Sequence, residues 1–361
     1  MYYFALFLLV ICSLSEVFYK QPPKILFVAI YILITLMAIF RFGQLGDYFD
    51  YYYLYQNPLL LRDPLFIIYA SSLRLLGFDY QGFVTITELI CMGLAFPFFY
   101  KTCKYSFISL LAFYCYTYML CPMSALRQAV CLSMLLCSYS LLVDEKKNLF
   151  YIVTILGCFI HLSFFSVLLI GILYDKKFFN HPMLIFAVLF SALLMFVGVD
   201  FFAGFRSVFK DRSITYAEVG AFDNLIQLAL RLLIILPLFF FNPDYRSDGY
   251  YSKAICIIGF ILYCFLSSDL LVAGRIEFFY RTFICLFIAY LSYLYKSILR
   301  DSVLLVLIAV HVVLFFKNIG AAISQGDYVE SVTVYNFPYI SIFDKSEIDK
   351  YTTIDKYNYA E

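Results

Sequence analysis

Charged residues and tryptophan are scarce in this chain. Only 14% of the 361 residues are charged and 64% are hydrophobic, whereas about one quarter of a soluble domain is charged. Tryptophan is absent and tyrosine occurs 34 times, so tyrosine has to supply the aromatic belts at the membrane interfaces. The composition excludes an ordinary soluble domain and predicts a surface that faces lipid. A net charge of +1 gives no basic footprint, so no nucleic-acid partner is expected.

Sequence motifs for nucleotide and zinc chemistry are also missing. The chain has no Walker loop, no GxGxxG before a helix, no CxxC pair and no HExxH, which argues against nucleotide hydrolysis and a zinc centre. Nearly all of the eleven cysteines lie in apolar runs, where free cysteine behaves as a small hydrophobe. We therefore expect no disulfide, no zinc centre and no cofactor.

Apolar runs approach the roughly 20 residues that cross a bilayer and recur along the whole chain. They predict an all-α fold, a polytopic transmembrane helical bundle with about 10–12 spans, short or re-entrant helices included. Residues 64–77 are too short for a span and carry Arg74, so they favour a re-entrant or interfacial helix. Residues 149–174 contain His161 midway, which favours two short helices that meet there. Regular spans are expected near 2–19, 24–40, 82–100, 105–121, 126–143, 183–202, 224–241, 251–268, 277–295 and 302–319.

Lysine and arginine in the short loops predict the orientation, because loops rich in these residues stay cytoplasmic. All the basic loops fall on one side of the predicted span order: 20–24, 101–104, 146–147, 176–177, 246–253 and 296–300. The outer face then carries 41–63, 122–127, the turn at His161, 203–223, 269–276 and the tail. We predict one membrane domain over residues 1–320 and a polar, tyrosine-rich tail over 321–361 on the outer side.

The loop after the second span is rich in polar and aromatic residues. From Arg41 to Tyr55 it holds one arginine, two glycines, two carboxylates and five tyrosines. Glycine lets backbone amides approach a ligand, arginine matches phosphate oxygens, and tyrosine offers a flat face with a hydrogen-bonding edge. This composition suits a sugar phosphate. The structural alternative is a charged loop that caps a helix beside belt tyrosines.

Three ionisable residues lie within or at the ends of apolar spans, where they commonly mark function. Arg127, followed by Gln128, opens a long apolar helix at the outer boundary, where an arginine can also simply snorkel. Glu88 needs neutralisation or a partner, and Arg74 and Arg127 are the candidates. His161 suits a general base near neutral pH or a hydrogen bond within the core.

A second arginine cluster occurs where the last predicted outer loop runs into a span. Arg275, Glu277, Tyr280 and Arg281 lie within a few residues of one another there. This arrangement repeats the arginine at a membrane boundary that is seen at Arg127.

In their order and spacing, these elements resemble the EpsG-like branch of the Wzy polysaccharide polymerases. The resemblance covers about residues 20–175 and returns near 275–285. It departs from the family pattern where Gly46 directly precedes Asp47 without an intervening residue, and where Asp63 replaces the usual glutamate. The residues that carry it are the Arg41 loop with Asp47-Tyr and the following tyrosines, Phe66, Leu75–Gly77, Arg127-Gln128, the turn at 144–147, and Phe159-Ile-His161-Leu-Ser163.

The resemblance implies a membrane-embedded glycosyltransferase, similar in fold to the GT-C type, in the bacterial cytoplasmic (inner) membrane. It implies metal-independent, inverting transfer that joins oligosaccharide repeat units carried on undecaprenyl diphosphate, one as donor and one as acceptor. The product would be an O-antigen of lipopolysaccharide or a capsule, made at the periplasmic, outer side. Besides the lipid bilayer, a chain-length regulator is a partner that the resemblance allows.

Residue roles follow from this chemistry. Arginines stabilise the charge that develops on the leaving diphosphate, and a positioned base removes the proton of the acceptor hydroxyl. The diphosphate is predicted to bind Arg41, Arg127, Arg275 and Arg281. The catalytic set is predicted to be Arg127 with a base that is His161, Asp47 or Glu88. The glycan is predicted to contact Tyr48, Asp50, Tyr51, Tyr52, Gln128 and Tyr280.

Other classes of membrane protein share part of this pattern. A flippase for lipid-linked units would also carry intramembrane charges, but it should show paired halves with helices broken at corresponding positions, and the sequence shows neither clearly. An O-antigen ligase shares the arginine chemistry and differs mainly in its acceptor. Transporter and ligase therefore remain the alternatives to a polymerase.

Overall fold

The computed structural model is helical throughout the part of the chain that it describes. Within that part no extended strand forms, and only two isolated β-bridges occur, so the predicted all-α fold is confirmed. The chain divides into two compact units, Met1–Phe165 with Tyr295–Glu361, and Ser166–Leu294. The described residues are 1–19, 21–43, 45–61, 63–174, 181–197, 221–245, 247–267, 269–326 and 328–353.

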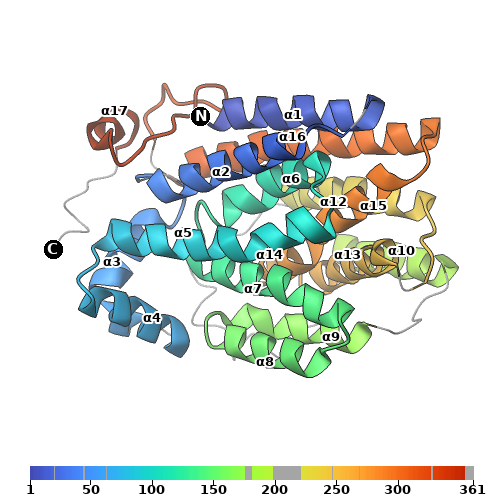
Figure 1. Ribbon diagram of the computed structural model, residues 1–361, viewed down its shortest axis with the longest axis horizontal. Coiled ribbons are helices and arrows are strands. Elements are labelled where there is room, and N and C mark those ends of the chain that lie inside the picture. The colour runs from blue at the N-terminus through green and yellow to red at the C-terminus, as the bar shows by residue number, and fades with distance from the viewer. Residues whose placement is uncertain are drawn as a thin grey trace. The chain divides into compact units, whose positions relative to one another are not determined.

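The first unit contains the helices on either side of the polar loops. They are α1 (Tyr2–Phe18), α2 (Lys24–Phe40), α3 (Tyr48–Gln56), η1 (Pro58–Leu60), α4 (Pro64–Leu75), α5 (Tyr80–Pro97), α6 (Phe107–Ala112), α7 (Leu126–Val143), α8 (Lys147–Cys158), α16 (Ile298–Gln325), η6 (Lys345–Glu347) and α17 (Ile348–Tyr351). α5 packs on α2 and α7, and α7 packs on α8 (Figure 1). α1 packs on α2, α6 and α16, so the last long helix lies beside the first.

Two helices of this unit change to wider π-helical turns before they end. α5 continues as η2 (Phe98–Thr102) and α6 continues as η3 (Phe113–Tyr118). A π-helical turn loosens the regular ladder of backbone hydrogen bonds and often marks a special site. In η3 the carbonyl of Cys115 accepts a hydrogen bond from the side-chain amide of Asn318 at 3.0 Å, so α16 is tied to this turn.

Three described helices are long and apolar enough to cross a membrane by length and composition. They run from Tyr80 to Thr102, from Leu126 to Val143 and from Ile298 to Ser324. Eight further apolar helices of 10–17 residues occur in the described part of the chain. Single apolar helices that leave large side chains such as Phe7, Ile25 and Phe186 on the surface are expected where lipid replaces water.

Both irregular stretches contain short helices, as the sequence predicts, and whether 64–77 is re-entrant or interfacial stays a prediction. Residues 64–77 contain the short helix α4 of 12 residues. In 149–174, α8 ends at Cys158 and a 3-10 helix, η4 (Leu162–Val167), begins directly after His161. The break at His161 is therefore confirmed. Of the outer loop predicted over 203–223, residues 203–220 lie outside the described residues.

Several predicted cytoplasmic loops meet at one end of the first unit. The side-chain amide of Gln21 donates to the carbonyls of Lys104 and Tyr105 at 3.0 and 3.2 Å. Lys296 donates to the carbonyls of Phe18 and Tyr19, both at 3.0 Å. These contacts confirm that the basic loops 20–24, 101–104 and 296–300 share an end. The place of the other basic loops, and the side of the membrane on which all of them lie, stay predictions.

The same end holds a buried carboxylate that the sequence analysis passed over. Glu16 accepts hydrogen bonds from the backbone N–H groups of Phe107 and Ile108 at 2.8 and 3.1 Å and from the Ser106 hydroxyl at 3.3 Å. The first N–H groups of a helix lack partners within the helix, so Glu16 caps α6 from α1.

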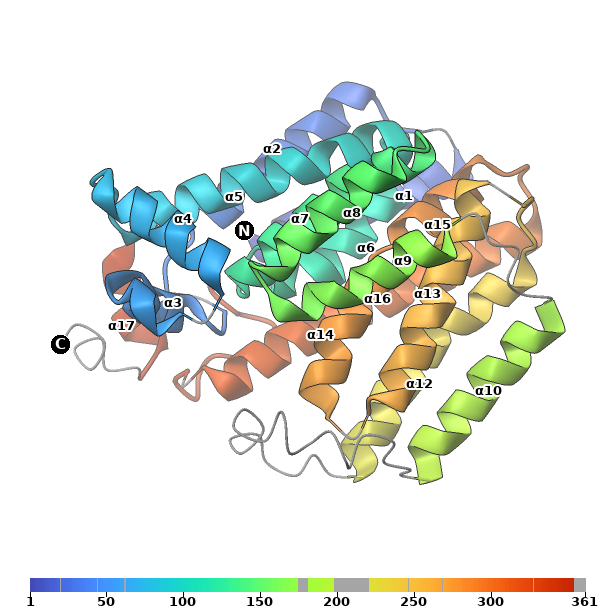
Figure 2. The same cartoon turned by 90° about the horizontal axis from the view of Figure 1, so that it is seen from below.

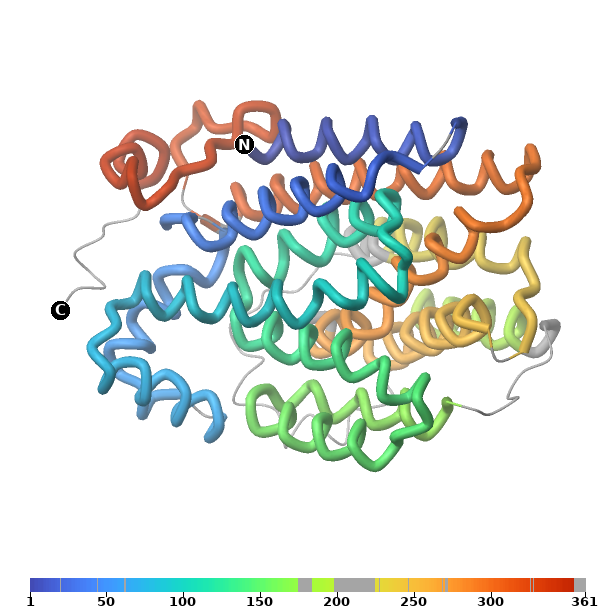
Figure 3. Tube along the Cα trace, viewed as in Figure 1, coloured from blue at the N-terminus to red at the C-terminus, as the bar shows by residue number. Residues whose placement is uncertain are grey.

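The tail folds back onto the first two helices instead of leaving the unit, as the trace in Figure 3 shows. α16 runs on to Gln325, so the change in composition near residue 321 falls within its last turn. The backbone N–H of Ile342 donates to the carbonyl of Phe40 at 2.9 Å, and the N–H of Phe42 donates to Ile340 at 3.0 Å. The Tyr3 hydroxyl donates to the carbonyl of Val334 at 2.8 Å. Residues 328–353 therefore cover the start of α1 and the end of α2.

The second unit is built around α13. Its helices are α9 (Leu168–Leu173), α10 (His181–Val197), α12 (Ala221–Ile235), η5 (Leu236–Phe240), α13 (Asp248–Phe265), α14 (Leu270–Arg281) and α15 (Ile284–Tyr293). α13 packs on α10, α12, α14 and α15 (Figure 2). Gly259 on α13 permits close contact with α14, since an added Cβ would lie 2.3 Å from the Cβ of Tyr280.

Candidate functional site

Arg127 lies at the start of α7, where three segments of the first unit meet. Its Nε donates to the Tyr51 hydroxyl of α3 at 3.1 Å, and its Nη1 forms an ion pair with the Asp63 carboxylate directly before α4. The guanidinium carbon lies 5.7 Å from the centre of the Tyr51 ring. The side chain of Arg127 keeps 27% of its surface exposed and that of Asp63 keeps 14%. The guanidinium group is thus oriented by two partners and still accessible.

The loop before α3 is held against the turn before α7. Gly43, Leu45 and Gly46 all have positive φ, at 62°, 59° and 53°, a backbone conformation that glycine adopts without steric cost. A Cβ at Gly46 would lie 2.6 Å from the Ser124 hydroxyl, and the backbone N–H of Asp47 lies 3.5 Å from that same hydroxyl. This close approach brings Asp47, one helical turn before Tyr51, to the Arg127 end of the unit.

The turn at His161 is attached to the same end. The carbonyl of Phe159 accepts a hydrogen bond from the backbone N–H of Leu65 at 3.1 Å, which links this turn to the start of α4. The Cys131 thiol donates to the carbonyl of Gly157 at 3.4 Å, and Cys131 lies one turn after Arg127 on α7. Arg127, Asp47 and the turn at His161 therefore belong to one group of neighbouring segments. We call the group formed by Arg127, Asp63, Tyr51, Asp47 and His161 the arginine site.

His161 itself is half-buried and bonded to a near neighbour in the chain. Its Nδ1 accepts a hydrogen bond from the backbone N–H of Ser163 at 3.2 Å and lies 2.8 Å from the Ser163 hydroxyl. The carbonyl of His161 accepts from the N–H of Phe164 at 3.0 Å. His161 is thus the N-terminal cap of η4.

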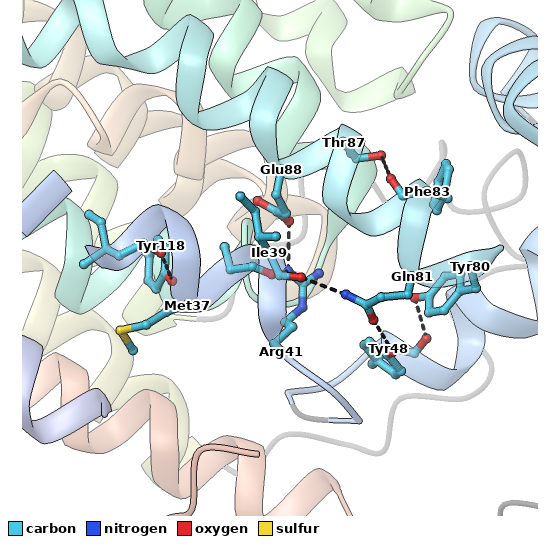
Figure 4. A network of polar contacts seen from close by, with 12 residues as sticks. Met37, Ile39, Arg41, Tyr48, Tyr80, Gln81, Phe83, Thr87, Glu88 and Tyr118 are labelled. Atoms are coloured by element: carbon cyan, nitrogen blue, oxygen red, sulfur yellow. Dashed lines mark hydrogen bonds and ion pairs between the residues drawn. The ribbon is translucent and has the colours of Figure 1, made fainter. Parts of the chain in front are cut away.

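Arg41 and Glu88 form a separate, fully buried ion pair, drawn in Figure 4. The distance from Arg41 Nη1 to Glu88 Oε1 is 3.0 Å, and the two side chains are 1% and 0% exposed. The prediction that Glu88 pairs with Arg74 or Arg127 is therefore wrong. Arg74 instead donates to the carbonyl of Gln56, and Arg127 pairs with Asp63. The predicted contact of Arg41 with a diphosphate would require its side chain to leave Glu88.

Hydrogen bonds around this pair join three helices (Figure 4). Gln81 on α5 donates to the carbonyl of Ile39 on α2 at 2.7 Å, and its oxygen accepts from the Tyr48 hydroxyl on α3 at 3.2 Å. The Tyr80 hydroxyl donates to the carbonyl of Tyr48 at 2.7 Å. The network holds α3 in place and so positions Tyr51 for Arg127.

The tyrosines of α3 divide between two faces of the helix. Tyr48, Tyr51 and Tyr55 are buried, and the ring of Tyr55 stacks on Phe83 with 4.7 Å between the ring centres. Asp50 is exposed, Tyr52 is half-buried, and Tyr53 is 41% exposed. Of the predicted glycan contacts on this helix, only Asp50 and Tyr52 lie on the open face. Tyr53, which the sequence analysis did not single out, joins them there.

Gln128 of the first unit and two arginines of the second unit, Arg231 and Arg281, are buried. Gln128 is buried, and its side-chain nitrogen has no hydrogen-bond partner among the described residues. Arg281 is buried and pairs with Glu277 at 3.3 Å, and Arg231, whose guanidinium carbon lies 3.6 Å from the ring centre of Tyr263, pairs with the same carboxylate at 3.3 Å.

The other predicted contacts of the second unit differ in exposure. Arg275 is half-buried on α14. Tyr280 is buried, and its hydroxyl donates to the carbonyl of Ser166 at 2.5 Å. Whether these residues meet the arginine site stays a prediction, because they belong to the second unit.

Asp63, the partner of Arg127, and Ser163, the partner of His161, are two polar residues to which the sequence alone assigned no role. Asp63 had one available signal, since it stands where the resembled family usually has a glutamate. Ser163 had none beyond its place two residues after His161. Among the described residues, no three His, Cys, Asp or Glu side chains come together to hold a metal ion, and metal independence stays a prediction.

Apolar helices, a helical fold and a polar site at one end of a unit define a polytopic helical membrane protein. The chain belongs to the EpsG family, which it matches over residues 24–341. This membership is consistent with a Wzy-like polysaccharide polymerase. No curated protein and no solved structure matches the chain.

Proposed function

We propose that this protein polymerises a bacterial polysaccharide by joining oligosaccharide units carried on a polyprenyl diphosphate, of which undecaprenyl diphosphate is the expected form. The observation that carries the proposal is the partly exposed Arg127, held by Asp63 and Tyr51 where the polar loops meet. Membership of the EpsG family supports a polysaccharide polymerase-like role. We place the reaction at the outer face of the cytoplasmic membrane, on the side opposite the basic loops.

The reaction needs a group that accepts charge on the leaving diphosphate. The acceptor hydroxyl attacks the anomeric carbon of the donor, a new glycosidic C–O bond forms, and the C–O bond to the diphosphate breaks with inversion. Negative charge then grows on the diphosphate oxygens, where preorganised donors lower the barrier. The guanidinium group of Arg127 has five N–H donors, and Asp63 and Tyr51 bind only some of them. The remaining N–H groups can bind the diphosphate oxygens.

The glycan part of the substrates is proposed to lie along the open face of α3. Tyr52 and Tyr53 offer rings against which sugar faces can pack, and Asp50 offers a carboxylate to sugar hydroxyls. The buried tyrosines Tyr48 and Tyr51 take another role, since they hold Gln81 and Arg127 in place.

Proton removal from the acceptor hydroxyl requires a base that the substrate can reach. Glu88 is fully buried against Arg41, so we assign this pair to holding α2 and α5 together. Asp47 and His161 are both partly exposed at the arginine site and remain as the candidates.

Reconstitution of the purified chain tests the proposal. Proteoliposomes that contain it are given the cell's own polyprenyl diphosphate-linked repeat unit, with a metal chelator present, and products are resolved as a ladder on a gel. We expect a ladder and release of polyprenyl diphosphate. Arg127→Ala should reduce the rate about 10²- to 10³-fold, the usual effect of losing one such donor. Arg74→Ala, which removes an exposed arginine in the last turn of α4, is the matched control and should leave the ladder intact.

Other outcomes assign the protein to another class. Movement of the intact lipid-linked unit across the bilayer without release of polyprenyl diphosphate would identify a flippase. Release that occurs only when a different glycan or lipid acceptor is added, and gives a single product, would identify a ligase. Either result would overturn the polymerase proposal.

A further inference from the structure

We infer that His161 works as a hydrogen-bond donor through Nε2 and is not the base, an inference that rests on the proposed function. Ser163 is assigned as the positioning residue that sets the required tautomer. The inference depends on the contact that the backbone N–H of Ser163 makes with Nδ1 of His161.

The contact at Nδ1 determines where the ring proton lies. The backbone N–H of Ser163 points at Nδ1, with 3.2 Å between the nitrogens. A backbone N–H can only donate, so Nδ1 must present its lone pair. In a neutral imidazole one nitrogen carries the proton and the other accepts. The proton of His161 is therefore on Nε2.

The start of η4 explains why this arrangement is retained. The first N–H groups of a helix have no acceptor within it, and the N–H of Ser163 belongs to the second residue of η4. Nδ1 of the capping His161 supplies that acceptor, as Ser or Asp side chains do at other helix starts. The opposite tautomer would set a ring N–H against the Ser163 N–H. A base that accepts through Nε2 needs that opposite tautomer.

The position of the turn gives the Nε2–H a use. The carbonyl of Phe159 accepts a hydrogen bond from the N–H of Leu65, two residues after Asp63. The carbonyl of Gly157 accepts one from the thiol of Cys131, one turn after Arg127. A donor on this turn belongs to the same group of segments as the guanidinium group that we assign to the diphosphate. The Nε2–H then stabilises charge on the leaving diphosphate together with Arg127.

The proton of the acceptor hydroxyl must go to another group. Asp47 is the remaining candidate, because Glu88 is buried in its ion pair. Asp47 is partly exposed and lies one turn before Tyr51, which bonds Arg127. In the complete step the hydroxyl oxygen bonds the anomeric carbon, its proton passes to the Asp47 carboxylate, and the diphosphate leaves with its electron pair.

Substitution of His161 by glutamine or alanine separates a donor from a base. The side-chain amide of glutamine can donate at the position of Nε2 but cannot act as a base, whereas alanine can do neither. The measurement is the initial rate of polyprenyl diphosphate release by proteoliposomes. Loss of such a donor in His161→Ala should slow release by about 10²- to 10³-fold relative to the wild type. We expect His161→Gln to be at least about 10-fold faster than His161→Ala, because glutamine restores a donor. Equal, strongly reduced rates in both variants would overturn the donor role.

Nitrogen NMR on ¹⁵N-histidine-labelled protein tests the tautomer without any activity. The chain has three histidines, and comparison with His161→Gln identifies the signals of His161. We expect the one-bond coupling to hydrogen on Nε2. A proton on Nδ1 would contradict the inference even if the enzyme polymerises normally. If wild-type protein makes no polymer, the proposed function fails while this measurement still decides the tautomer.

Ser163 provides the matched pair for the positioning role. Ser163→Ala keeps the backbone N–H and should preserve the Nε2 proton in the NMR spectrum. Ser163→Pro removes the N–H at a first-turn position, where proline is compatible with a helix. We expect this variant to mix the two tautomers in the NMR spectrum and to slow release at least several-fold. An unchanged spectrum in Ser163→Pro would remove Ser163 from the positioning role.

Discussion

Arg41 and Glu88, 47 positions apart in the chain, bond each other directly in the interior of the first unit, with 3.0 Å between Nη1 and Oε1. Neither side chain is open to solvent. Burial removes both charged groups from water, and the attraction between them offsets part of that cost. Removal of either partner would leave the other as an unpaired buried charge. The pair therefore ties the end of α2 to α5, on which the orientation of the polar loops depends.

The first prediction concerns this ion pair. Arg41→Met or Glu88→Leu alone should destabilise the protein by about 3–5 kcal/mol, because each leaves an uncompensated buried charge. The double variant should recover most of that loss. The free energy of unfolding in detergent micelles measures both effects. A stable double variant that still forms a ladder would show that Arg41 does not hold the diphosphate, and a stable double variant without a ladder would support its predicted role there.

The second prediction concerns Asp63. Asp63→Asn should remove the ion pair with Arg127 and let the guanidinium group take other orientations, so turnover should fall by about 10- to 100-fold, as for a misplaced catalytic group. Asp63→Glu keeps the charge and should retain most of the rate. Initial rates over a range of donor concentrations provide the measurement. An asparagine variant as active as the glutamate variant would contradict the positioning role.

The third prediction concerns Gly43 beneath the tail. A Cβ at Gly43, where φ is +62°, would lie 1.9 Å from Cδ1 of Ile348. Gly43→Ala should lose about 1–2 kcal/mol from the left-handed backbone and about 1–3 kcal/mol from overpacking. Gly77→Ala is the matched control, because Gly77 also has positive φ, at +85°, but faces open space. Its loss should be the backbone part alone.

A second substitution isolates the contact with the tail. Addition of Ile348→Ala to Gly43→Ala should recover the stability lost to overpacking. Addition of Ile348→Ala to Gly77→Ala should recover no stability. Thermal unfolding of the four variants supplies the comparison. Equal losses in Gly43→Ala and Gly77→Ala would mean that residues 328–353 do not press on this loop.

The fourth prediction separates the two faces of α3. Tyr53→Ala should change the free energy of unfolding by less than about 0.5 kcal/mol, because the ring is exposed, yet weaken binding of the lipid-linked glycan. Tyr55→Ala should cost about 3 kcal/mol, because the buried ring stacks on Phe83. Donor KM and thermal unfolding, measured on both variants, provide the test. A Tyr53→Ala variant with unchanged KM would remove the open face from glycan binding.

The fifth prediction concerns the side of the membrane. A cysteine at position 146, between α7 and α8, should react with an impermeant maleimide only after the cells are opened, since lysine-rich loops stay cytoplasmic. A cysteine in place of the exposed Tyr53 should react in intact cells. The partly exposed Cys137 and Cys158 are replaced by serine beforehand. Labelling of position 146 in intact cells would reverse the orientation and move the arginine site to the cytoplasmic side.

The sequence by itself determined the features that depend on neighbouring residues. The scarcity of charge led to the all-α membrane fold, and the polar break at His161 led to two short helices, as the structure has them. Gly43 and Gly46 take positive φ, a conformation that costs glycine little because it has no side chain. The basic loops 20–24, 101–104 and 296–300 share one end of the first unit because alternate loops of a membrane protein return to the same side.

Only the tertiary structure decided which side chains meet across the fold. Glu88 faces Arg41 because the rotation of α5 against α2 turns it there, and hydrophobicity along α5 allowed Arg74 or Arg127 equally well. The same rotation of α3 buries Tyr51 against Arg127 and leaves Tyr53 open, although both belong to one run of tyrosines. Asp63 reaches Arg127 through a chain separation of 64 residues. Such pairings depend on the rotation of each helix about its own axis. A helix that is apolar on all sides, facing lipid on one side and other helices on the other, carries no pattern in its sequence that specifies this rotation.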